Sequence, residues 1–199
     1  MNNTTPTPEA IVQETLDSIN SLVEAFRREP YTFLYESDLQ AWLTGDLRKR
    51  IPYRLSIKRS NTQTPPYELG LVYSEYGGKI DIVCLDPKKS QTSDMSPYKG
   101  FDTYIYNLPI LVGIELKYRK MGDSFKVTQI MADLAKLESY PEIPNPLAIG
   151  FVQDESDVDD FLASLPPLHH PQKETKITKA GFVYVVTPRD TFAIHPNEE

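Results

Sequence analysis

Three ionisable side chains stand inside the two most apolar stretches of the sequence. Asp81 interrupts GGKIDIVCLDP, residues 77–87. Glu115 and Lys117 interrupt LPILVGIELKYRK, residues 108–120. Both stretches have the apolar, β-branched composition that is typical of strands. An unpaired charge in the interior of such a strand is costly. We therefore expect these groups to be paired with one another or with a ligand.

The alternation of side chains along a strand decides which of these groups can meet. Successive side chains point to opposite faces, so Glu115 and Lys117 share a face about 6–7 Å apart. If the two strands are neighbours, Asp81 meets Glu115 across the sheet. Two close carboxylates repel each other and raise a pKa. Because a divalent cation removes the repulsion and hard oxygen ligands suit Mg²⁺, we expect a metal site between the strands.

The pattern KID, a long spacer and then ELK resembles the PD-(D/E)XK nuclease superfamily, which has the restriction-endonuclease-like fold with an αβββαβ core. The resemblance covers about residues 34–152. It implies that Asp81, Glu115 and the backbone carbonyl of Leu116 bind one or two Mg²⁺ or Mn²⁺ ions. It also implies that Lys117 orients or helps to deprotonate the attacking water and stabilises the phosphate oxygens.

The same family carries an acid on its first core helix, and Glu36 in FLYESDLQAWL is the best match. By resemblance Glu36 holds a metal-bound water or a second metal and has a catalytic role. An ordinary acid in the first turn of a helix is the competing interpretation. Glu75, just before a hairpin, is an alternative candidate for this acid. Glu24 and Asp38 are weaker candidates. On the helix that follows the second strand, we expect Gln129 and Asp133 to face solvent.

The resemblance implies Mg²⁺-dependent hydrolysis of phosphodiester bonds, with DNA as the expected substrate. A homodimer and a partner protein that supplies specificity are both compatible with it. The alternative is a nuclease fold that has lost catalysis and binds protein or nucleic acid, since a fold does not imply an activity. The candidates for phosphate contacts are Arg48, Lys49, Arg50, Arg54, Lys58, Arg59, Arg119, Lys120 and Lys126. For the run 48–59, a solvated helix end followed by a charged edge strand is the competing interpretation.

Composition narrows the classes of protein further. The 199 residues are 40% apolar and 25% charged, as expected for one soluble globular domain without disulfides. The net charge of −7 argues against a surface that is basic throughout, but it leaves room for a local basic patch. The single cysteine, Cys84, fits a reducing cytoplasm. The first ten residues lack the features of a signal peptide, and no apolar run is long enough to span a membrane.

The elements that position the candidate residues follow from hydrophobic periodicity and end signals. We expect a disordered segment over 1–7 and a single domain over 8–196. Thr7 and Pro8 predict the start of the first helix. We expect helices at 8–28, 34–49, 124–139 (capped by Ser124) and 155–165. We expect strands in RIPYRLSIKRS, ELGLVYSEY, KIDIVCLD, ILVGIELKYR, PLAIGFVQ, AGFVYVVTP and TFAIH, with a long loop over 86–109.

These elements predict an α/β fold. We expect a mixed central sheet flanked by helices, with the αβββαβ core that the resemblance implies. An extra N-terminal helix and a C-terminal strand pair are expected to extend this core.

Overall fold

The structure is a computed structural model that describes residues 5–57, 67–77, 79–92, 104–124, 126–140, 142–165 and 169–195. The helices are α1 (Pro8–Arg28), α2 (Glu36–Arg50), α3 (Pro87–Ser90), α5 (Val127–Glu138) and α6 (Val158–Leu162), with 3-10 turns at Pro30–Thr32 and Glu155–Asp157. The strands are β1 (Arg54–Ile57), β2 (Tyr67–Gly70), β3 (Val72–Tyr76), β4 (Ile80–Leu85), β5 (Ile110–Arg119), β6 (Asn145–Val152), β7 (Gln172–Glu174), β8 (Val183–Val186) and β9 (Thr191–Ile194).

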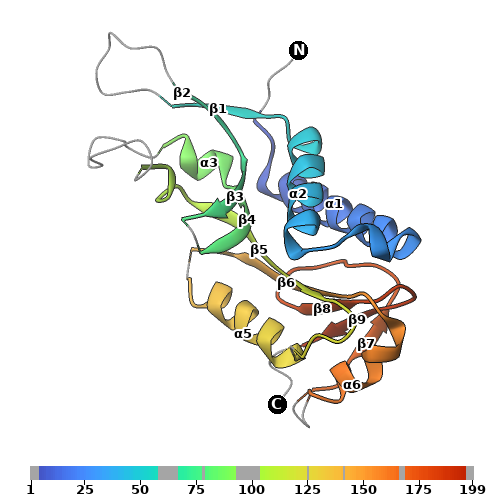
Figure 1. Ribbon diagram of the computed structural model, residues 1–199. Helices are drawn as coiled ribbons and strands as arrows, with labels where there is room; N and C mark the ends of the chain where they lie inside the picture. Colours follow the sequence, from blue (N-terminus) through green and yellow to red (C-terminus); the bar gives the residue numbers. More distant parts are fainter. Residues whose placement is uncertain are drawn as a thin grey trace.

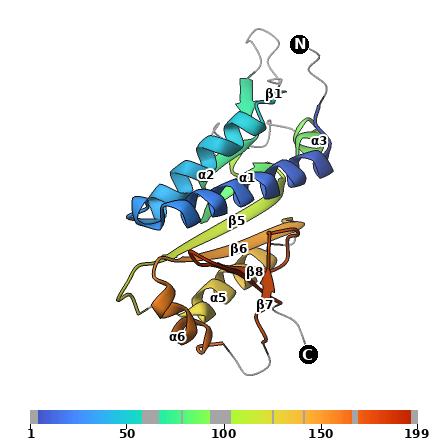
Figure 2. The same cartoon turned by 90° about the vertical axis from the view of Figure 1, so that its right-hand side faces the viewer.

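A seven-stranded mixed sheet forms the centre of the molecule, with strand order β3-β4-β5-β6-β8-β9-β7. Strand β4 runs antiparallel to both β3 and β5, whereas β5, β6 and β8 run parallel to one another. Strand β9 is antiparallel to β8 and to β7. Helices α1 and α2 cover one face of the sheet, and α5 and α6 lie on the other (Figures 1 and 2). The predicted α/β class is confirmed, as are the N-terminal helix and the pairing of β8 with β9.

The N-terminal helix begins where the sequence predicts. The Thr7 hydroxyl accepts a hydrogen bond from the backbone N–H of Ala10 at 3.2 Å, and Pro8 occupies the first helical position. Along the buried side of α1, Phe26 makes edge contacts with Tyr118 of β5 and Phe151 of β6. These contacts fix α1 across the middle of the sheet. Within the described residues no helix is long and apolar enough to cross a bilayer.

Several predicted elements differ from the structure. The segment 86–109, expected as a loop, contains α3, and the helix expected over 155–165 is a 3-10 turn followed by the short helix α6. Helix α5 begins at Val127 rather than at residue 124, because the side chain of Gln129 accepts the N–H of Lys126 at 2.9 Å and caps the helix there. Ser124 lies in the preceding turn and is not the cap. The stretch ELGLVYSEY is divided at Leu71, where β2 ends its pairing with β1 and β3 joins the main sheet.

Two glycines allow α5 to approach the sheet closely. Gly150 of β6 lies beside Lys117 in the register, and a Cβ atom there would overlap Cδ1 of Ile130. A Cβ atom on Gly113 of β5 would come within 3.3 Å of Cδ2 of Leu137 on α5, and within 3.1 Å of Ile143 beyond its end. Ile130 is fully buried, so it cannot move aside into solvent. The position of α5 over β5 therefore depends on the missing side chains at these two positions.

Candidate functional site

The site forms where β4 and β5 separate. Their regular pairing ends at Ile82 opposite Ile114, and the continued register places Asp81 opposite Glu115. At this point Oδ2 of Asp81 accepts the backbone N–H of Leu116 at 2.7 Å. The Asp81 carboxylate therefore lies against β5 at the residue between the other two candidate groups. The metal hypothesis requires Asp81 and Glu115 to lie near each other, and the negative charge of Asp81 contributes to raising the pKa of Glu115.

Glu115 is the most buried acid of the site, with a side chain that is 5% exposed. Its Oε1 lies 2.6 Å from Nζ of Lys136, which projects from α5 and also bonds the carbonyl of Lys79. Burial raises the pKa of Glu115 to about 7. The negative charges of Asp81 and Asp133 add to this rise, while Lys136 opposes it. Ionising this carboxyl in the folded chain therefore costs free energy.

Lys117 lies between carboxyl groups from both sides of the sheet. Its Nζ is 3.7 Å from Oε1 of Glu36 and 3.5 Å from Oδ2 of Asp133. Burial by itself lowers the pKa of Lys117, but the attraction of Glu36 and Asp133 outweighs it, so the pKa is raised. Lys117 consequently stays protonated at neutral pH and acts as a fixed positive charge.

Glu36 reaches the site from the first residue of α2. Burial raises its pKa, and the charge of Asp81 adds to the rise. Lys117 and a hydrogen bond from the backbone of Tyr118 act in the opposite direction. Burial also raises the pKa of Asp133, and the charge of Lys117 acts to lower it. Acids from α2, β4, β5 and α5 thus share one partly desolvated region.

The alternatives to Glu36 are placed differently. Glu75 has a positive φ of 52° and accepts a hydrogen bond from Nε2 of Gln40 at 2.8 Å. Gln40 also donates to the backbone oxygen of Asp81 at 2.9 Å. Asp38 caps the start of α2, where it accepts two backbone N–H groups, and Glu24 is exposed on α1. Of these four acids, Glu36 is the one that forms an ion pair with Lys117.

We call the assembled groups the acid–lysine cluster, which consists of Glu36, Asp81, Glu115, Asp133, Lys117 and Lys136. Four carboxylates against two ammonium groups leave a formal charge of −2 when all six are ionised. Such an excess in a partly buried region favours a divalent cation. Within the described ranges, however, no three acidic, histidine or cysteine side chains are already arranged to hold a metal ion.

Sequence reasoning missed the two members on α5. The expectation that Asp133 faces solvent is wrong, because its side chain is 19% exposed and pairs with Lys117. Gln129 is exposed, as expected. Asp133 and Lys136 are three residues apart and so lie on one face of the helix, beside the buried stripe. That spacing was available in the sequence, but nothing in it showed which strand the face would meet.

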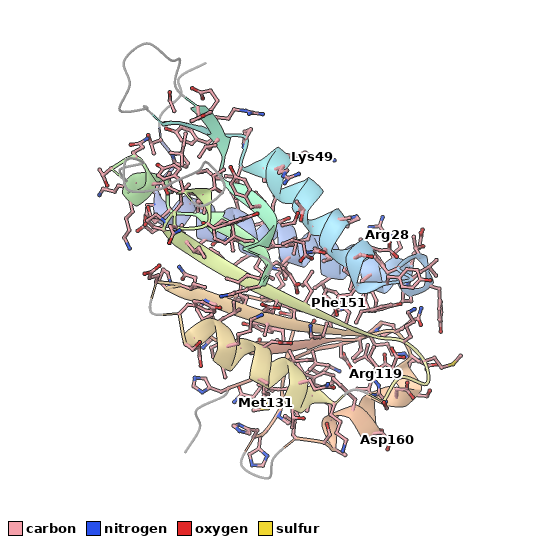
Figure 3. The ribbon with its side chains drawn as sticks, turned by 60° about the vertical axis from the view of Figure 1, so that its left-hand side comes forward. Arg28, Lys49, Arg119, Met131, Phe151 and Asp160 are labelled. Atoms are coloured by element: carbon pink, nitrogen blue, oxygen red, sulfur yellow. The ribbon has the colours of Figure 1, made fainter. Side chains whose placement is uncertain are left out.

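The basic run at the end of α2 lies away from the cluster. Arg48 is twelve residues beyond Glu36, about 18 Å along the helix axis. Arg50 is held by Asp46 at 2.6 Å and by Glu14 at 3.7 Å, so it ties α2 to α1. Lys49 is exposed and well apart from Arg119 (Figure 3). Arg48 and Arg54 line a depression beside β3, and Lys58 and Arg59 lie outside the described residues.

The remaining basic candidates follow β5. Arg119 shares the face of Lys117, with its Nε 3.8 Å from Oδ2 of Asp157 and its guanidinium over the ring of Phe161. Lys120 lies over the ring of Tyr35, with Nζ 4.1 Å from the centroid. Lys126 is exposed just before α5. Of the basic candidates, Arg119 and Lys120 are thus within three residues of Lys117.

Comparison of the chain with protein-family models, with curated proteins and with solved structures finds no match.

Proposed function

We propose that this chain is a Mg²⁺-dependent nuclease of the PD-(D/E)XK type that hydrolyses phosphodiester bonds, with DNA as the substrate. One observation carries the proposal: Asp81, Glu115 and Lys117 converge on one partly buried region, although they come from two strands far apart in the sequence. Glu36 joins them from the N-terminus of a helix, as the resemblance implies.

The surrounding architecture supports a restriction-endonuclease-like core. Helix α2 carries Glu36, and after the separate β1–β2 pair come β3, β4 and β5, with α3 between β4 and β5 and with β4 antiparallel to both its neighbours. Helix α5 then connects β5 to the parallel strand β6. This order of one helix, three strands, one helix and a parallel strand agrees with the αβββαβ arrangement of the family.

The donor set fits a magnesium ion. Asp81, Glu115 and the carbonyl of Leu116 supply hard oxygen atoms. The N–H of Leu116 donates to Asp81 on β4. Within a strand, the N–H and the carbonyl of the same residue point to the same neighbouring strand. The carbonyl of Leu116 therefore also faces β4. Lys136 is the group that a cation at Glu115 would replace, and its half-exposed side chain has room to turn into solvent.

When bound, the metal would lower the pKa of an attacking water and neutralise charge on the scissile phosphate. The residues of the chain supply the remaining chemistry. Lys117 is kept protonated by Glu36 and Asp133, so it donates hydrogen bonds to phosphate oxygens as negative charge develops on them. Glu36, with a raised pKa and a 40% exposed side chain, would hold a metal-bound water, as the resemblance implies, and could accept a proton from it.

A second candidate function is that of a catalytically inactive nuclease-fold module that binds protein or nucleic acid. The observation that favours it is the contact of Lys136 with Glu115, since an internal cation neutralises part of the cluster without a metal. Under this candidate the six charged groups would form a structural ion-pair network. The two candidates differ in what added metal does to the protein.

Cleavage and metal binding test the proposal together. Purified protein is incubated with supercoiled plasmid and with circular single-stranded DNA, in Mg²⁺, Mn²⁺ or EDTA. We expect cleavage by the wild-type chain only with metal, and its loss in Lys117→Ala, which should fold normally because Lys117 is 30% exposed. Lys88→Ala is the matched control, since Lys88 is exposed on α3, at the opposite end of β4 from Asp81.

Thermal unfolding provides the second measurement. Mg²⁺ should raise the melting temperature of the wild-type chain, because a ligand that binds only the folded state stabilises it. The rise should be absent in Asp81→Asn. Cleavage by Lys117→Ala at the wild-type rate would end the catalytic assignment. A wild-type chain that neither cleaves nor gains stability from metal would favour the inactive module.

A further inference from the structure

Large apolar side chains are exposed together in two loops beside the acid–lysine cluster. Tyr31, Leu34 and Tyr35 lie between α1 and α2 with 65%, 57% and 60% exposure, and Met121 follows β5 with 69%. In the described part of the chain, one other large apolar residue, Tyr106, is comparably exposed. We call Tyr31, Leu34, Tyr35 and Met121 the apolar platform. Exposed apolar side chains that gather in one place mark interaction sites.

The two loops of the platform are joined by specific contacts. Lys120 lies over the ring of Tyr35 at 4.1 Å, and the hydroxyl of Tyr118 donates to the carbonyl of Phe33 at 2.5 Å. Asp38 accepts the N–H groups of Leu34 and Tyr35, which fixes the first loop to the start of α2. The platform is therefore held in place before any partner binds, which reduces the entropy lost on binding.

The platform adjoins the cluster at both loops. Tyr35 directly precedes Glu36, and Lys120 comes three residues after Lys117. Both loops lie at the same edge of the molecule in two views (Figures 2 and 3). Arg28, which is exposed at the end of α1, lies at this edge as well (Figure 3). A molecule bound on the platform would thus reach the ionised groups of the cluster.

The chemistry of the edge favours a nucleic acid over a protein partner. The tyrosine rings offer π-faces of the kind on which bases stack, and stacking accepts any base. Arg28 and Lys120 supply positive charge beside the rings, which suits a phosphate backbone. The nearby acids Asp38 and Asp123 are each engaged by backbone N–H groups within the loops, and Glu29, beside Arg28, accepts the hydroxyl of Thr32 at 3.2 Å. A duplex buries its base faces in its own stack, so the rings suit unpaired bases.

We propose that the apolar platform binds unpaired bases of a single-stranded nucleic acid, whose backbone then enters the acid–lysine cluster. This inference rests on the proposed nuclease function, because it assigns the class of substrate to the same site. Tyr35 is the central residue, since one face of its ring meets Lys120 while most of the side chain stays exposed. The platform thereby selects single strands, or the unpaired end of a duplex, over continuous double helix.

The test measures binding without cleavage. Fluorescence anisotropy follows a labelled oligothymidine and a labelled hairpin duplex of equal length, both with Ca²⁺ in place of Mg²⁺, because a divalent cation offsets the negative charge of the cluster. We expect the wild-type chain to prefer the single strand. Tyr35→Ala should weaken single-strand binding by about 5- to 150-fold, the range found when one stacking ring is removed. Tyr35→Phe keeps the ring and should bind nearly as the wild type does.

Three controls make the result specific. Tyr35→Leu keeps apolar area but removes the ring, so it should lose affinity as Tyr35→Ala does. Tyr106→Ala removes an exposed tyrosine that contacts Tyr76 instead of the platform, and it should leave binding unchanged. Lys88→Ala removes an exposed lysine on α3, at the opposite end of β4 from Asp81, and should also leave binding unchanged. Circular dichroism checks that each variant is folded.

Four outcomes overturn the inference: no single-strand binding by the wild-type chain, preference for the duplex, unchanged affinity in Tyr35→Ala, or wild-type affinity in Tyr35→Leu. The last would point to a protein partner that needs apolar area only. Failure of the nuclease proposal is seen separately, because it depends on Lys117→Ala in the cleavage assay. The wild-type chain could fail to cleave any substrate while Tyr35→Ala still weakens single-strand binding. That result would support the proposed role of the platform and refute the catalytic assignment.

Discussion

Replacing Glu115 by glutamine should stabilise the chain at alkaline pH. Glu115 is raised by burial to a pKa of about 7, against an ordinary value of 4.5. Below pH 4.5 the carboxyl is protonated in both the folded and the unfolded chain, so its contribution to stability is fully present there. As pH rises from 4.5 to 7, the unfolded chain releases the proton first and this contribution is lost.

The shift of the pKa sets the size of the effect. A change from 4.5 to about 7 corresponds to at most about 3 kcal/mol in the free energy of unfolding. The pKa is raised although Lys136 acts to lower it. Glutamine resembles the protonated acid and does not titrate. Glu115→Gln should therefore match the wild type near pH 4.5 and exceed its stability by up to about 3 kcal/mol at pH 8.

Urea unfolding at pH 5, 6, 7 and 8 in EDTA measures the difference directly. Glu138→Gln, an exposed change on the neighbouring helix α5, is the matched control and should show no such trend. Added Mg²⁺ should then stabilise the wild type and not Glu115→Gln. A stability difference that stays constant from pH 5 to pH 8, or a wild type that is the more stable protein at pH 8, would refute the reasoning.

Two further predictions concern the frame around the cluster. Asp81→Ala leaves the N–H of Leu116 without its acceptor and should lower the free energy of unfolding by about 1–3 kcal/mol, whereas Asp81→Asn keeps an acceptor and should lose less. Equal losses in the two variants by urea unfolding would contradict that account. Gly150→Ala should cost about 1–3 kcal/mol, because the new methyl group overlaps buried Ile130. Gly45→Ala, in open space on α2, is its control and should be neutral or stabilising by up to about 1 kcal/mol.

Local sequence patterns predicted the parts of the fold that depend on neighbouring residues. The strand 110–119 was predicted with its observed bounds, because its apolar run continues without a break. The alternation of side chains placed Glu115 and Lys117 on one face, and both do contact α5. Thr7 predicted the start of α1 by its capping chemistry. The start of α5 was misplaced, because Ser124 has suitable chemistry but Gln129 makes the cap.

Tertiary structure alone decided how the cluster is completed. Periodicity shows which helix residues share a face, but the direction of that face depends on where the helix packs. Asp133 and Lys136 enter the site because Gly113 and Gly150 let α5 settle closely on the sheet. Likewise, the identity of a charged residue does not determine which group it forms an ion pair with in the fold.

Arg50 was a candidate for phosphate binding in the sequence, yet in the fold it ties two helices together. The sequence by itself therefore determined which groups carry charge inside the strands, since that follows from residue type and a period of two. Their distances, their pKa shifts and their additional partners depend on long-range packing, which no local pattern encodes.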